Sequence, residues 1–209
     1  MKRALLKEIV HHAPFTLAGA TSGVIFMMIF RNISHETAET VFYVFHPLHV
    51  VLSALVTASM YRLHAAGDRR LWVLIPIGYV GSIGIATLSD SVVPFLGERL
   101  LGLSHAHVHL GFIEMWWLVS LSAIAGIAIA IWRPRTEFPH FAHVLLSTWA
   151  SLFHVIMAAG GALAWHVYGL ILGFLFLAVW VPCCVSDIVF PLLFTRQKAG
   201  ESEQGHSPE

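Results

Sequence analysis

Long apolar segments separated by short polar ones dominate the pattern of this chain. Six of them approach the roughly 20 residues that a helix needs to cross a bilayer. They lie at 13–31, 41–61, 71–96, 108–132, 138–164 and 168–195. Because lipid offers the backbone no hydrogen-bond partners, the pattern predicts an all-α membrane protein with six transmembrane helices. Residues 1–12 then form an N-terminal segment, and the polar residues 196–209 are expected to be a disordered tail.

Basic residues gather in alternate connections between these segments. They follow the second, fourth and sixth segments, as Arg62, Arg69, Arg70, Arg133, Arg135, Arg196 and Lys198. The opposite connections hold only Arg31 and Arg99. Since positive residues are retained on the cytoplasmic side, we expect both termini to be cytoplasmic. The expected location is the plasma membrane, which is the inner membrane if the source is bacterial.

An internal repeat divides the apolar region into two halves, 13–96 and 97–195. The second and fifth segments share H-x-x-H-V-x-L-S, beginning at His46 and His140. The third and sixth share S-D-x-V-x-P-x-L, beginning at Ser89 and Ser186. A weaker H-x-x-F match joins residues 12–15 to 109–112. Because each half has three spans, the second half enters the membrane from the opposite face, so the pattern predicts two inverted three-helix repeats.

Histidine is the unusual feature of the composition. The chain has 14 histidines although only 11% of its residues are charged, and such side chains in a membrane are costly and usually functional. Histidines three residues apart lie on one helix face, about 5–6 Å apart at Cβ, so two imidazoles can share one ion. A carboxylate and a third histidine would complete a site for Zn, Fe, Mn, Co or Ni.

The repeat predicts two such clusters, one under each membrane face. The helix order brings to the outer face His46, His49 and Asp90, at least one of His105, His107 and His109, and Glu114 as a further ligand or proton acceptor. It brings to the inner face His140, His143 and Asp187, with His11 or His12. Ser53 and Ser147, one turn beyond each histidine pair, are expected at most to orient a ligand.

Purely structural roles are the alternative for several of these residues. A lone histidine such as His154 is expected to pack and bond a neighbouring helix. Asp90 and Asp187 each precede a proline by four residues and can instead bond free backbone N–H groups. Cys183 lies one turn before Asp187, but Ala86 occupies the matching place, so we expect a small buried apolar group there.

The zero formal net charge argues against nucleic-acid binding. The expected partners are the bilayer and metal ions, with a homo-oligomer left open. We expect a transition-metal transporter. One alternative is a haem cytochrome, favoured by the 14-residue separation of His140 and His154 but opposed by Met60 and Leu63 at the matching places. Another is an intramembrane metal enzyme acting on a lipid or quinone.

Overall fold

A computed structural model describes residues 2–30, 32–65, 70–134, 137–161, 163–184 and 190–194. All regular structure in these residues is helical. In chain order the elements are α1 (Lys2–Ile29), α2 (His35–His64), α3 (Leu71–Thr87), the π-helical turn η1 (Leu88–Val92), α4 (Val93–Leu100), α5 (Gly111–Glu114), α6 (Trp116–Trp132), α7 (Glu137–Ala159), α8 (Trp165–Cys184) and α9 (Phe190–Leu193). The expected all-α class is therefore confirmed.

Four helices of the described chain are long and apolar enough to cross a membrane. They are His35–His64, Leu71–Leu100, Phe141–Ala159 and Trp165–Cys183. Two shorter apolar helical stretches, Ala13–Ile29 and Trp116–Trp132, accompany them. The architecture is thus that of a membrane-compatible helical bundle.

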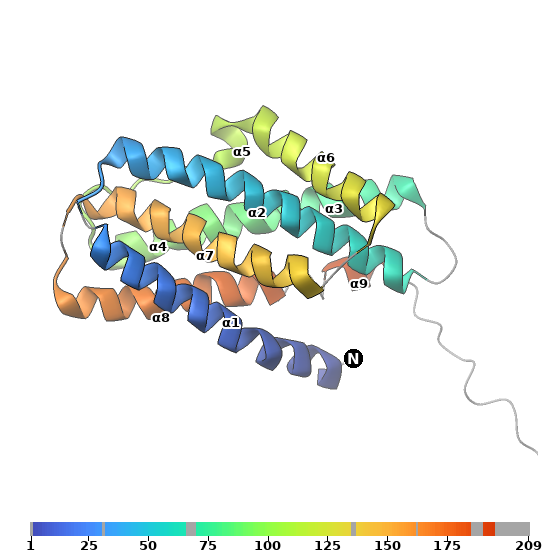
Figure 1. Ribbon diagram of the computed structural model, residues 1–209, viewed down its shortest axis with the longest axis horizontal. Helices are drawn as coiled ribbons and strands as arrows, with labels where there is room; N and C mark the ends of the chain where they lie inside the picture. Colours follow the sequence, from blue (N-terminus) through green and yellow to red (C-terminus); the bar gives the residue numbers. More distant parts are fainter. Residues whose placement is uncertain are drawn as a thin grey trace, which may run out of the picture.

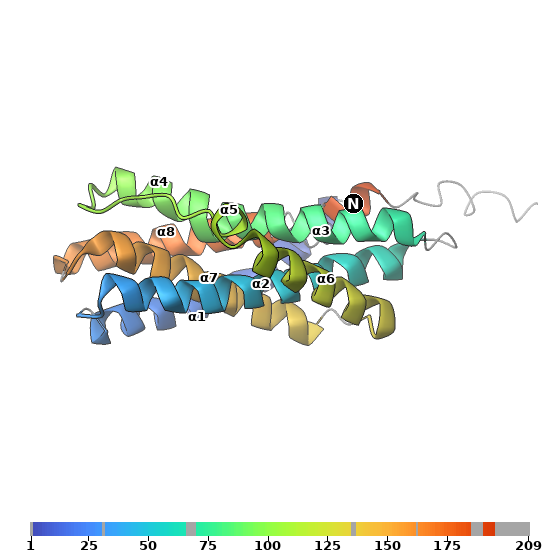
Figure 2. The same ribbon diagram turned by 90° about the horizontal axis from the view of Figure 1, so that it is seen from above.

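The long helices run roughly along one axis, with α2 and α7 side by side in the middle (Figures 1 and 2). The connections from α1 to α2, from α4 to α5 and from α7 to α8 gather at one end of the bundle (Figure 1). This is called the histidine end, because it carries His35, His105, His107 and His109. The opposite end, with the start of α1 and the end of α2, is called the basic end and carries Arg62.

Helix α2 begins earlier than the hydrophobic pattern predicts. Ser34 caps it, its hydroxyl oxygen accepting the Thr37 N–H at 3.2 Å, a preferred way to satisfy a free donor at a helix start. The helix therefore includes a polar first turn that the hydropathy pattern assigned to a loop. His46 then lies about 16 Å along the helix from its start, at 1.5 Å per residue.

The fourth predicted segment, 108–132, does not form one helix. Residues 101–110 form turns and irregular chain, α5 is a single turn, and Met115 at φ −128° and ψ 44° separates it from α6. The expectation that Glu114 lies two turns beyond His107 on one helix face is therefore wrong. The hydropathy pattern could not show this break, because the residues on both sides of Glu114, from Gly111 to Ile113 and from Met115 to Val119, are apolar.

A π-helical turn interrupts the third long helix at Asp90. Pro94 has no N–H and its ring would clash with the carbonyl four residues earlier, which is that of Asp90. The Val93 N–H instead donates to the carbonyl of Leu88, the five-residue bond of a π turn. The sequence thus places its buried carboxylate on a widened turn, a feature often found at functional sites.

Candidate functional site

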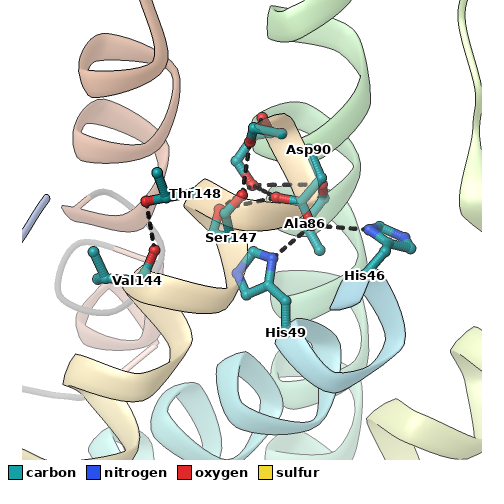
Figure 3. A network of polar contacts seen from close by, with 9 residues as sticks. His46, His49, Ala86, Asp90, Val144, Ser147 and Thr148 are labelled. Atoms are coloured by element: carbon teal, nitrogen blue, oxygen red, sulfur yellow. Dashed lines mark hydrogen bonds and ion pairs between the residues drawn. The ribbon is translucent and has the colours of Figure 1, made fainter. Parts of the chain in front are cut away.

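Asp90 is the centre of a fully buried polar network (Figure 3). Its Oδ2 atom accepts hydrogen bonds from Nδ1 of His46 at 2.9 Å and Nδ1 of His49 at 2.7 Å. Its Oδ1 atom accepts from the hydroxyls of Ser89 at 2.7 Å and Ser147 at 2.8 Å. All five side chains are 0% exposed. Helices from both halves of the chain therefore meet on one carboxylate.

These hydrogen bonds fix the tautomer of the two imidazoles. A carboxylate accepts, so Nδ1 of His46 and of His49 carries the hydrogen, and a neutral ring then keeps a lone pair on Nε2. Both Nε2 atoms are buried and have no hydrogen-bond partner among the described residues. A carboxylate that holds the far nitrogen of a histidine is a common support for a metal ligand. With four donors bonded, Asp90 has the geometry of such a support.

His143, from the second half of the chain, lies against His49. Their rings stack with centroids 5.4 Å apart and planes 7° apart. Cys183 of α8 completes a group in which the ligand atoms of His49, His143 and Cys183 all lie within 4.8 Å of one another. The three side chains are at most 1% exposed. Two imidazoles and a thiol from three helices form a donor set of the kind that Zn²⁺ accepts.

The structure therefore brings residues from both predicted clusters together in one central cluster. His143 was expected under the inner face, apart from His49, but the two rings are in contact. The physical reason is that α2 begins at His35 and runs antiparallel to α7, so that His49, midway along α2, lies beside His143 in the second turn of α7. Separation of His143 from the first histidine pair is thus contradicted.

Four other predicted ligands lie wholly or partly outside the described residues. His11 and His12 belong to α1 and His140 to α7, but their side chains are not among those described, and neither is any part of Asp187. The proposed inner contacts of these residues stay predictions.

The structure brings the histidines of the segment before α6 to a different place. His109 donates its backbone N–H to Nε2 of His154 at 3.2 Å, and its Nδ1 lies 3.5 Å from Oε2 of Glu114. The ring of His107 lies 5.2 Å from that of His109. His105 packs on Gly160, at the end of α7. In the described part of the chain, the polar contacts of His109 lead to His154 and Glu114, the His105 N–H donates to the Ala158 carbonyl, and the donors to Asp90 are other residues.

Burial sets the protonation of this segment. It lowers the pKa of His109 from its ordinary value, and the neighbouring His154 and His107 lower it further. It raises the pKa of Glu114 above its ordinary value. Both shifts favour the neutral forms.

A second buried acid and histidine pair was missed by the sequence reasoning. His154 Nδ1 lies 2.6 Å from Oε1 of Glu98, and neither side chain is exposed. His154 was expected to bond a neighbouring helix, and it does, but to a carboxylate. A sequence signal existed, because Glu98 is an acid only eight residues beyond Asp90 and two residues beyond the apolar segment 71–96.

The haem alternative finds no support at His154. Its Nδ1 atom is engaged with Glu98 and its Nε2 atom with the His109 amide, so no nitrogen is left for an axial iron bond. The stacked rings of His49 and His143 are also unsuitable, because imidazoles on opposite sides of one iron bind it end-on, each through a nitrogen about 2 Å from the metal.

Comparison with known proteins gives no further guide to function. No protein-family model, curated protein or solved structure matches this chain.

Proposed function

We propose that this chain is a six-span membrane protein that binds a divalent transition-metal ion at the centre of the bundle and carries it across the membrane. The observation that carries this proposal is the buried group of His49, His143 and Cys183, whose ligand atoms lie within 4.8 Å of one another. In a membrane, ionisable side chains facing the bundle interior commonly mark an ion pathway.

The donor set selects among metals. Imidazole suits Zn²⁺, Co²⁺, Ni²⁺ and Fe²⁺, and a thiolate favours the softer ions of this group, whereas Mn²⁺ prefers oxygen ligands. By accepting the Nδ1 hydrogen of His49, Asp90 would keep the Nε2 atom of that ring free to bind the metal. Three protein ligands would leave one coordination position open, which allows a cargo ion to be exchanged.

Helix packing supports the proposal of two inverted halves. Helix α2 packs on α7, α6 and α3, and helix α7 packs on α2, α1 and α8. Exchanging α1 with α6, α2 with α7 and α3 with α8 turns one set of neighbours into the other. The proposed ligands come from both halves, and many transporters bind their substrate at such a repeat interface near the bilayer midplane.

Six spans require that the two shorter apolar stretches also cross. Ala13–Ile29 and Trp116–Trp132 each have 17 residues, which corresponds to about 26 Å of helix and approaches the roughly 30 Å hydrocarbon core. Arg62, Arg70 and Arg133 lie at the ends of helices at the basic end. We therefore orient this end, with both termini, toward the cytoplasm of a plasma membrane.

Metal content and transport test this function. Purified protein dialysed against Zn²⁺ should retain a bound ion, and Co²⁺ in its place should give a thiolate-to-cobalt charge-transfer band that Cys183→Ser abolishes. His49→Ala and His143→Ala should each lose the ion. His64→Ala is the matched control, because His64 is an exposed residue that bonds the Met60 carbonyl of its own helix.

Transport is measured separately, in vesicles that contain the purified protein and a trapped metal-sensitive dye. Wild type should admit Zn²⁺, and the His143→Ala protein should not. Full metal content in His49→Ala, His143→Ala and Cys183→Ser would contradict the central site. Bound metal without flux in the wild type would contradict transport alone.

A further inference from the structure

Glu98 and His154 form a buried pair whose bonding is incomplete. Oε1 of Glu98 is bonded to His154, whereas Oε2 is fully buried and has no hydrogen-bond partner among the described residues. The ring of His154 is fixed at its edge by Phe42, with centroids 5.7 Å apart. A buried acid with one oxygen unbonded destabilises the fold, so its presence in the interior of a bundle indicates a function.

The hydrogen bonds of His154 define its charge. Its Nε2 atom receives the backbone N–H of His109, so it offers a lone pair. Its Nδ1 atom must then carry the hydrogen and donate it to Glu98, which makes the ring neutral. The pair therefore has no cation to balance a Glu98 carboxylate. A proton on the Glu98 carboxylate would balance that charge and would remove the cost of a buried anion.

A graded path connects this pair to the histidine end. His107 is exposed, the side chain of His109 is 15% exposed, and His154 and Glu98 are buried. The rings of His109 and His154 are 5.6 Å apart. On the α8 side of Glu98, the apolar ring of Phe174 packs against Gly97 of α4. Arg99, the next residue of α4, is exposed. Among the described contacts, the titratable group that touches Glu98 is His154.

We propose that Glu98 and His154 are a proton-binding pair, loaded from the histidine end, whose proton moves in exchange for the metal ion. The exchange part rests on the proposed function. When the hydrogen bond from the His109 N–H to Nε2 of His154 opens, an arriving proton forms an N–H bond at Nε2, while the Nδ1–H bond breaks and its hydrogen passes to Oε1 of Glu98 across 2.6 Å. The ring returns to neutral and the carboxylate becomes a carboxylic acid, so one proton has moved inward.

Infrared spectroscopy tests the proton-binding part without any metal. The wild-type protein should show the C=O stretch of a protonated buried carboxyl, and Glu98→Gln should remove that band. Glu36→Gln is the matched control, because Glu36 is an exposed acid in the first turn of α2 at the histidine end, and the band should remain. His154→Gln should shift the band, since the donor to Oε1 changes. A band unchanged in both Glu98→Gln and His154→Gln would overturn the proposal.

Proton flux tests the exchange part. In vesicles with a trapped pH dye, an inward Zn²⁺ gradient should drive protons outward through the wild type. The Glu98→Gln protein should still bind Zn²⁺, but its metal-driven proton flux should be at least tenfold lower than that of the wild type. Equal proton flux in Glu98→Gln and wild type would overturn the exchange. If wild type carries no Zn²⁺ at all, the proposed function fails, and the infrared result still decides whether the pair holds a proton.

Discussion

Two carboxylates lie on the same long helix, and their surroundings differ. Asp90 has both oxygens bonded, by four donors from two histidines and two serines. Glu98 has one oxygen bonded, by one histidine. Both are 0% exposed. The comparison teaches that burial alone does not assign a role: a completely bonded acid holds its neighbours in place, whereas an incompletely bonded one has capacity left for a proton.

Removal of the Asp90 carboxylate should have the largest effect on the molecule. Asp90→Ala leaves His46, His49, Ser89 and Ser147 without their shared acceptor. Breaking a buried network of this kind typically costs about 3–5 kcal/mol, so the free energy of unfolding in detergent should fall by that order and bound metal should be lost. Glu98→Gln, which keeps an acceptor for His154, should change stability by less than about 1 kcal/mol. Equal losses in the two variants would remove the distinction between the acids.

Crowding the ring of His46 should have the next largest effect. A Cβ added at Gly111 would lie 2.4 Å from Cδ2 and 2.6 Å from Nε2 of His46, so Gly111→Ala must displace the ring from its present position beside Asp90. Overpacking of this kind costs about 1–3 kcal/mol. Gly84→Ala is the control, since nothing lies within 4 Å of the added Cβ, and this helical position should be neutral or slightly stabilised. Thermal unfolding of both variants in one detergent measures the difference.

Removing one of the four donors should have a graded effect on the Asp90 network. Ser147→Ala should lower stability by about 1 kcal/mol, the net contribution of one hydrogen bond. Because Asp90 then holds His49 less firmly, metal affinity should fall by about 10-fold. Competition with a coloured chelator measures this affinity. Thr148→Ala removes the neighbouring hydroxyl, which bonds the Val144 carbonyl of its own helix, and should leave affinity unchanged.

The smallest expected effect is the pH response of the histidine end. The folded-state pKa of His109 is below its ordinary value of 6.5, so its contribution to stability is complete above pH 6.5 and is lost as the pH falls through the lowered pKa. The pKa of Glu114 is raised, so its protonation stabilises the fold at more acidic pH. His109→Gln should flatten the decline just below pH 6.5, as measured by proteolysis of the segment before α6.

The sequence predicts the all-α class and the two histidine partners of Asp90, for physical reasons that have limits. Long apolar runs have no alternative to helix in lipid, and a three-residue spacing places His46 and His49 on one face. The pairing of Glu98 with His154 spans 56 residues and has no counterpart in the repeat. Cys183 is buried with Val144 and Val179, as expected of a small apolar group, but its place beside His49 and His143 could not be predicted, because the repeat puts Ala86 at the matching position.

The π turn at Leu88–Val92 has a consequence for the register of two helices. Seven residues of α helix return nearly to the same face, so Ser147 and His154 both face the third long helix from α7. Their partners Asp90 and Glu98 are eight residues apart, which in an uninterrupted α helix would place them about 80° apart around the axis. The extra residue in the widened turn cancels that rotation. Deleting one residue of the turn would therefore leave a continuous α helix with the two acids seven residues apart and still on one face, whereas restoring α-helical hydrogen bonds without a deletion would rotate them about 80° apart.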